Sequence, residues 1–139
     1  MEFAEHEMTS AVEAVARQLF VATRPPWRRG AAGAAWERLT RIERYHRRSA
    51  VGEMVLPALR ELPERPTVGA RPEFTGEEYA AAAEASSRAL LEHRQPGAWE
   101  ELPERRRRRL VRTTAALTRT AVAAMPVRQD PDAPVPDHP

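Results

Sequence analysis

The chain has 139 residues, of which 22 are basic, 20 are acidic and none is cysteine. This length suits one domain with a single core. The absence of cysteine excludes disulfides, thiolate zinc sites and a thiol nucleophile. Every basic residue is arginine, so the chemistry of a phosphate-loop lysine, a Schiff base or a kinase-type ATP lysine is also excluded.

The formal net charge of +2 is unevenly distributed. The three aspartates all lie in the last ten residues, so residues 1–129 carry 22 arginines against 17 glutamates. Abundant arginine, alanine and proline, with no asparagine, suggest a GC-rich coding sequence, which is an explanation of the arginines that involves no function. The acidic first ten residues lack signal-peptide features and no run approaches 18 apolar residues, so we expect a cytoplasmic protein without a membrane segment.

The most informative feature is an internal duplication. Residues 3–25 align with residues 74–96 at an offset of 71, with 8 identities in 23 positions. After eight additional residues in the first copy, residues 34–63 align with residues 97–126 at an offset of 63, with 7 identities in 30 positions. We therefore predict two copies, at residues 3–63 and 74–126, within one domain that spans residues 1–126.

Each copy has two segments in which apolar residues recur at helical spacing. Thr40 with Glu43 and Thr75 with Glu78 have the spacing of capping boxes at helix starts. The expected inner stripes are Met8, Val12, Val15 and Leu19; Val51, Val55, Leu59 and Leu62; Tyr79, Ala83, Leu90 and Leu91; and Leu110, Thr114, Leu117, Ala121 and Met125. These patterns predict an all-α four-helix bundle formed by two tandemly duplicated helical hairpins.

Three further segments are expected to be loops. Residues 25–35 form a long turn in the first copy, and residues 63–74 link the copies. In each copy a Trp-x-x-Leu sequence, Trp36 to Leu39 and Trp99 to Leu102, is expected to pack the turn onto the core. Residues 127–139 are acidic and proline-rich, and we expect a disordered tail.

Two arginine clusters occupy equivalent helix starts and are candidates for binding polyanions. They consist of Arg41, Arg44, Arg47 and Arg48 in the first copy, and Arg105, Arg106, Arg107, Arg108, Arg109 and Arg112 in the second. Five consecutive arginines cover every face of a helix, so one or more must lie near the core and extend outward. If the copies pack with two-fold symmetry, the clusters can form one basic surface. The alternative is a solvated helix surface balanced by nearby glutamates.

Trp27, with Arg28 and Arg29, lies in the long turn that the second copy lacks. An exposed tryptophan flanked by arginines suits a site that binds a protein partner. The alternative is a tryptophan that folds back over a helix end.

Catalytic and metal-binding patterns are weak. Glu43 and His46 have the Glu-x-x-His spacing of di-iron bundles, but the duplicate positions are Arg106 and Arg109, so we expect no metal and place His46 at the core edge. Residues 1–126 contain no aspartate, which excludes a Ser-His-Asp triad there. We expect no cofactor and no catalytic residues.

The sequence Phe3-Ala4-Glu5-His6-Glu7-Met8, the Trp-x-x-Leu sequence, Glu43-Arg44-Tyr45-His46 and Val55-Leu56-Pro57 together resemble a group of small all-helical actinobacterial proteins that carry no assigned function. The resemblance covers most of residues 3–126. It implies a bacterial cytosolic protein and supplies no catalytic residues.

These observations favour a non-enzymatic protein–protein interaction or adaptor module, with a homodimer as one form. The alternative is a nucleic-acid-associated protein that uses the two arginine clusters, and a third hypothesis is a small enzyme or metal-binding bundle.

Overall fold

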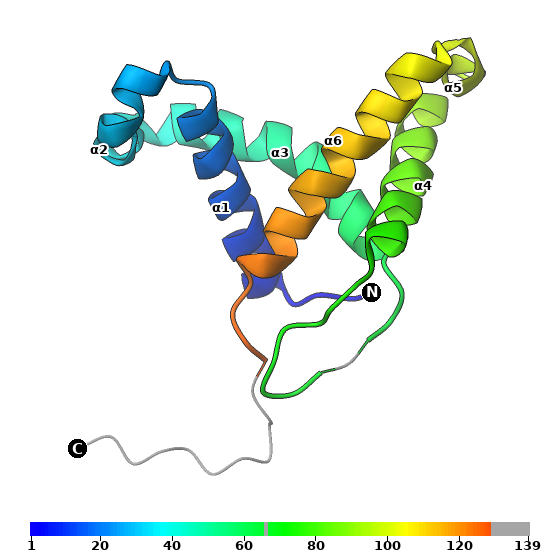
Figure 1. Cartoon of the computed structure of the whole chain (residues 1–139), viewed down its shortest axis with the longest axis horizontal. Coiled ribbons are helices and arrows are strands. Elements are labelled where there is room, and N and C mark those ends of the chain that lie inside the picture. Colours follow the sequence, from blue (N-terminus) through cyan, green and yellow to red (C-terminus); the bar gives the residue numbers. More distant parts are fainter. Residues whose placement is uncertain (66, 129–139) are drawn as a thin grey trace.

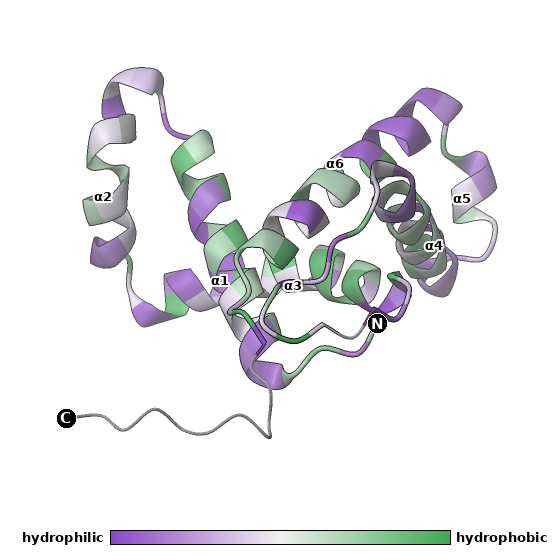
Figure 2. Cartoon of the chain, turned by 60° about the horizontal axis from the view of Figure 1, so that its bottom comes forward, coloured by the Kyte–Doolittle hydropathy of each residue, from purple (hydrophilic) through white to green (hydrophobic). Residues whose placement is uncertain are grey.

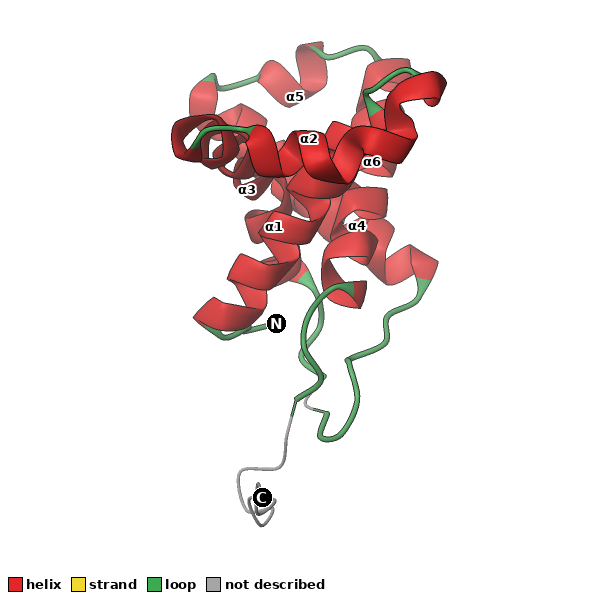
Figure 3. Cartoon of the chain, turned by 90° about the vertical axis from the view of Figure 1, so that its left-hand side faces the viewer, coloured by secondary structure: helices red, strands yellow, loops and turns green. Residues whose placement is uncertain are grey.

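The computed structural model describes residues 1–65 and 67–128, in which all regular structure is helical. Six α-helices and one 3-10 helix occur within these residues (Figures 1 and 3). In chain order they are α1 (Glu5–Ala22), η1 (Pro26–Ala31), α2 (Ala32–Arg38), α3 (Arg41–Glu61), α4 (Gly76–Arg94), α5 (Ala98–Glu101) and α6 (Glu104–Ala123). The predicted all-α class is thus confirmed.

The four long helices cross one another rather than lying parallel (Figure 1). Helices α3 and α6 contact each other, and each of them also packs against both α1 and α4. The end of the molecule that carries α2 and the start of α3 diverges from the end that carries α5 and the start of α6 (Figures 1 and 2). The helices therefore meet around one shared core and separate toward these two ends.

The core is one apolar cluster to which all four long helices contribute. Ala11, Val15, Val55, Leu59 and Ala121 are fully buried within it. Several of the most buried side chains are alanines, which allow helix backbones to approach closely. Figure 2 shows that the start of α6 is hydrophilic.

The predicted inner stripes are largely confirmed. All four expected residues of α3 are buried, as are Tyr79 and Ala83 of α4. Met8, Val12 and Leu19 of α1 and Leu110 and Leu117 of α6 are only half-buried. Leu90 and Leu91 of α4 are also half-buried, and they line a cavity of about 290 Å³ between α3, α4 and α6. The neighbouring Ser86 and Ser87 are buried in their place.

The two predicted turns contain short helices that the sequence analysis did not predict. The expected loop at residues 25–35 forms η1 and most of α2, since its alanines favour helix despite Gly30 and Gly33. In the second half, Gly97 adopts a left-handed conformation with φ 86° before α5. The Glu92 carboxylate accepts hydrogen bonds from the N–H groups of Gly97 (2.7 Å) and Trp99 (3.2 Å), which fixes this turn.

Both Trp-x-x-Leu sequences pack onto the core as predicted. Trp36 and Trp99 are 2% and 4% exposed, and the Trp36 ring lies 5.6 Å from the Phe20 ring. The α4 capping box is also present, since Thr75 and Glu78 accept each other's backbone N–H. At α3 only half of the box forms: Thr40 accepts from the Glu43 N–H, while the Glu43 side chain accepts from the Thr40 hydroxyl.

Two matching arginine–glutamate–phenylalanine clusters join the halves of the chain. Arg65, which follows α3, donates two hydrogen bonds of 2.7 Å to Glu78 at the start of α4. Its guanidinium lies 5.3 Å from the centre of the Phe74 ring. We call this group the Arg65 clamp.

The second cluster, the Arg128 clamp, repeats this arrangement at the start of α1. Arg128, which follows α6, donates to Glu7 at 3.0 Å and lies 5.6 Å from the Phe3 ring centre. The arginines are separated by the alignment offset of 63, and the glutamates and phenylalanines by the offset of 71. Each half thus sends its arginine to the first long helix of the other half.

The expected tail boundary at residue 127 is wrong, because Arg128 belongs to the folded part. Glu7 is only 4% exposed, so its carboxylate requires a partner there. Residues 129–139, the remainder of the predicted disordered tail, lie outside the described residues, as does Pro66 in the linker.

Removing the Arg128 side chain should destabilise the protein strongly. The Arg128→Ala substitution leaves the buried Glu7 carboxylate without its cation, and we expect the free energy of unfolding to fall by about 2–3 kcal/mol. Urea unfolding measures this change. The control Arg94→Ala removes an exposed ion pair with Glu53 and should cost less than about 0.5 kcal/mol. Similar small losses in both variants would contradict the role of the Arg128 clamp.

Both clamp carboxylates should make stability fall in acid. The hydrogen bonds from Arg65, together with the Thr75 N–H, lower the pKa of Glu78 from 4.5 to about 2. Burial alone would raise the pKa of Glu7, but Arg128 and the Ala4 N–H outweigh it and lower that pKa. Since the folded state holds the proton less tightly, this contribution to stability is present above pH 4.5 and is lost as the pH falls toward 2. The measurement is the free energy of unfolding at several pH values. Below pH 4.5 this free energy should fall less steeply for the double variant Glu7→Gln, Glu78→Gln than for the native chain.

Candidate functional site

An apolar groove lies between α1 and α3. It encloses about 770 Å³, and its walls combine half-buried apolar side chains with charged residues at the rim. We call it the α1–α3 groove. Its lining residues are Glu5, Met8, Thr9 and Val12 from α1, and Tyr45, Arg48, Ser49, Gly52, Glu53, Leu56, Pro57 and Arg60 from α3.

The α3 wall of the groove forms a continuous stripe. Tyr45, Ser49, Gly52 and Leu56 follow one another at spacings of four, three and four residues, which places them on one helix face. From Tyr45 to Arg60 the wall is about 22 Å long at 1.5 Å per residue. The Tyr45 side chain is 61% exposed, and Ile42, one turn earlier, is 68% exposed. Large apolar surface is therefore available along this face.

Gly52 is not required by the packing of the chain itself. A Cβ atom at this position would lie 3.6 Å from Leu56 Cδ1, which is an ordinary van der Waals distance. A glycine inside a helix costs about 1 kcal/mol relative to alanine. The floor of the groove is thus kept open at a cost in stability that the fold does not explain.

The equivalent face of the second half has a different character. At the alignment offsets, Tyr79 corresponds to Met8, Ala115 to Gly52 and Arg119 to Leu56. The Arg119 guanidinium lies 5.4 Å from the centre of the Tyr79 ring and covers it. The hollow beside α4 and α6 is lined by Glu84, Glu104, Arg107, Arg108 and Arg112 together with Ala80, Trp99, Val111 and Ala115. The apolar groove is therefore a feature of the first half.

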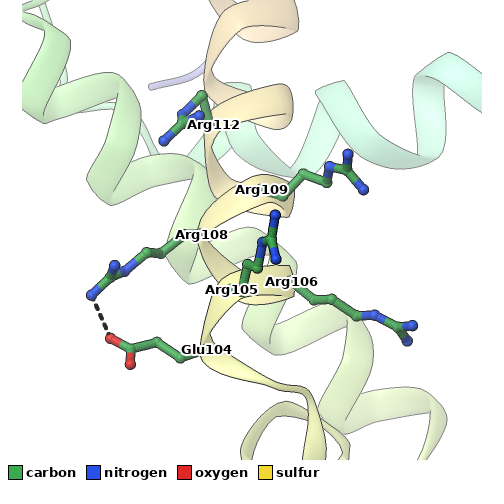
Figure 4. A pocket seen from close by; sticks show the side chains of 6 residues that line it. All are labelled: Glu104, Arg105, Arg106, Arg108, Arg109 and Arg112. Atoms are coloured by element: carbon green, nitrogen blue, oxygen red, sulfur yellow. Dashed lines mark hydrogen bonds and ion pairs between the residues drawn. The ribbon is translucent and has the colours of Figure 1, made fainter.

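The arginines at the start of α6 divide into two groups (Figure 4). Arg107 is the one that lies near the core, as expected from five consecutive arginines: it sits 5.9 Å from the Trp99 ring centre and 3.6 Å from Glu100. Arg108 pairs with Glu104 at 2.7 Å. The other four, Arg105, Arg106, Arg109 and Arg112, are exposed and form no salt bridge with any described residue.

The arginines at the start of α3 are mostly engaged within the fold. Arg48 pairs with Glu13 at 2.8 Å, Arg44 lies 3.9 Å from Glu37, and the Arg47 guanidinium lies 4.7 Å from the Phe20 ring centre. Arg41 is exposed. The two clusters lie at opposite ends of the molecule (Figure 1). The structure therefore does not bring them together into one basic surface.

Trp27 lies in η1 and is 81% exposed, so it does not fold back over a helix end. Arg28 is exposed beside it, and the side chain of Arg29 lies outside the described part of the structure. The fold thus leaves this tryptophan accessible, and its role as a partner-binding residue stays a prediction.

No metal-binding cluster of three or more His, Cys, Asp or Glu side chains was found among the residues that the structure describes. His46 is exposed, with its ring 5.8 Å from that of Tyr45, rather than at the core edge as expected. Within the described ranges, none of the helices is both long and apolar enough to cross a membrane.

No protein-family model, curated protein or solved structure matches the chain. The resemblance to small actinobacterial helical proteins therefore stays a prediction.

The position of Arg105 in the first turn of α6 should reduce stability. A positive charge there opposes the helix dipole, and Arg109 lies four residues away with the same charge. We expect Arg105→Glu to raise the free energy of unfolding by about 0.5–1 kcal/mol, because it reverses both effects. Arg105→Gln, which only removes the charge, should give about half of this gain. Thermal unfolding compares the variants, and a lower melting temperature for Arg105→Glu would contradict this view of the helix start.

Proposed function

We propose that the chain is a non-enzymatic protein-interaction module whose α1–α3 groove binds an amphipathic helix of a partner protein. The observation that carries this proposal is the long apolar face of α3 with its open floor at Gly52. The proposal assigns a function to the exposed side chains of α3 at this face, Ile42 and Tyr45, which the core does not bury.

The shape and length of the groove favour a helical partner. Two helices form its walls, and a stretch of about 22 Å accommodates about four turns of a third helix. Gly52 and Ser49 are small and lie between Tyr45 and Leu56, which allows a partner backbone to approach closely at the centre. Tyr45 and Ile42 can then contact apolar residues one or two turns along the bound helix.

The charges at the rim support an amphipathic rather than a wholly apolar partner. Glu5 and Glu53 carry negative charge, while Arg48 and Arg60 carry positive charge. A bound helix with an apolar stripe and mixed charges on its flanks would match both the floor and the rim. A large interface aromatic such as Tyr45 is typical of residues that contribute most to binding energy.

The two halves of the chain support the predicted tandem duplication, which we propose as the origin of the fold. Each half has the order long helix, short helix, long helix, with a buried tryptophan in the short helix. The Arg65 and Arg128 clamps are related by the same offsets as the sequence alignment. If the halves arose by duplication, the α1–α3 groove developed in the first half after the two copies had separated in sequence.

Replacing Gly52 by alanine should separate binding from stability. Alanine favours helix, so the free energy of unfolding should rise by about 0.5–1 kcal/mol. The added methyl group occupies the floor of the groove, so partner binding should weaken. A photo-crosslinking amino acid at position 45 reports binding in cells: we expect a discrete adduct that Gly52→Ala reduces.

The matched control places the same crosslinker at Ala81, which is exposed on α4. Equal adducts at positions 45 and 81, or an adduct at position 45 that Gly52→Ala leaves unchanged, would contradict a groove-bound partner. An adduct with twice the mass of the chain would identify the partner as a second copy.

A further inference from the structure

We infer that Arg105, Arg106, Arg109 and Arg112, the arginine face of α6, bind the phosphate backbone of a nucleic-acid duplex. This site goes beyond the proposed function. It lies at the opposite end of the molecule from the start of α3 and shares no residue with the α1–α3 groove (Figures 1 and 4).

These four guanidinium groups form no salt bridge with the described carboxylates. The neighbouring Arg107 and Arg108 are neutralised by Glu100 and Glu104. Residues 97–112 contain six arginines against three glutamates, so this end keeps a net charge of +3. Figure 4 shows these four side chains extending away from the α6 backbone, beside the Arg108–Glu104 ion pair.

The four arginines also repel one another. Arg105 and Arg109 are four residues apart, and Arg109 is three residues from both Arg106 and Arg112. Like charges at these spacings repel each other, and Arg105 and Arg106 also lie in the first turn of α6, where the helix dipole disfavours cations. A bound polyanion would remove these unfavourable terms. Guanidinium groups also bind phosphate through two parallel hydrogen bonds.

The length of the arginine face suits the charge density of a duplex. From Arg105 to Arg112 the face extends about 10 Å along α6. A duplex carries one phosphate charge for about every 1.7 Å of its axis, so the same length of duplex offers about six charges. All four exposed arginines can therefore contact phosphate groups of one duplex without a change in the fold.

The surroundings argue against two other anionic partners. Single strands are commonly held by stacking on aromatic side chains, but the only exposed aromatics among the described residues are Trp27 and Tyr45, which lie on other elements. A basic helix that inserts into an anionic membrane carries an apolar face beside the basic one. In α6 the apolar residues near the arginines, Leu110 and Val111, are half-buried. Because the contacts are to phosphates, we expect no sequence preference.

The test uses the full chain and a short labelled DNA duplex of mixed sequence, with binding followed by fluorescence anisotropy at several salt concentrations. Four phosphate contacts should give a slope of about −3.6 in the plot of log affinity against log salt, or roughly a 10²-fold loss between 50 and 200 mM salt. Replacing all four arginines by glutamine should abolish this salt-dependent binding. The single variant Arg109→Gln should reduce the slope by about 0.9.

The matched control removes the same charge from Arg28, Arg38, Arg41 and Arg60, which are exposed on other elements. This variant should bind the duplex as the native chain does. An equal loss in the control would show that only net charge matters and would overturn the assignment. It would also be overturned by unchanged binding of the α6 variant, by preference for single-stranded RNA, or by preference for phosphatidylserine vesicles over the duplex.

Discussion

The two arginine–glutamate–phenylalanine clamps are the interaction on which the arrangement of the chain depends. Each clamp attaches the segment that leaves one half to the helix that begins the other half, at Glu78 through Arg65 and at Glu7 through Arg128. The exchange is reciprocal, so neither half is complete without the other. With these ends held together, the opposite ends, which carry α2 and α5, are free to diverge (Figure 1). The surfaces at the two ends can therefore act separately.

Much of the fold could be predicted from the sequence because helical periodicity is a local signal. The stripes of α1, α3, α4 and α6 and the burial of both tryptophans were predicted in this way. The short helices η1, α2 and α5 were not, since four to seven residues are too few to show a period. The Arg128 clamp was missed for a different reason. Arg128 and Glu7 are 121 residues apart, and no local pattern identifies such a pair.

The candidate surfaces were predicted less completely. The sequence identified the arginines of α3 and α6, but it could not distinguish those that pair within the fold, such as Arg48 and Arg107, from those that do not, such as Arg109. That distinction depends on glutamates and aromatic rings brought together by tertiary structure. The α1–α3 groove had a readable signal, because Tyr45, Ser49, Gly52 and Leu56 share a helix face. The groove itself could not be predicted from this face alone, because its other wall is supplied by α1, whose position beside α3 depends on tertiary packing.

Aligned positions of the two halves carry different side chains on their outward faces. At the offset of 63, Ile42 corresponds to Arg105, His46 to Arg109 and Ser49 to Arg112. The same outward face of the aligned helix therefore presents Ile42, His46 and Ser49 in α3, and guanidinium groups without a salt bridge to any described residue in α6. Neither set is needed to bury the core, which leaves both free to change. The halves share one core and are also joined by the two clamps, while the start of α3 and the start of α6 lie apart, so one framework presents two surfaces of different chemistry.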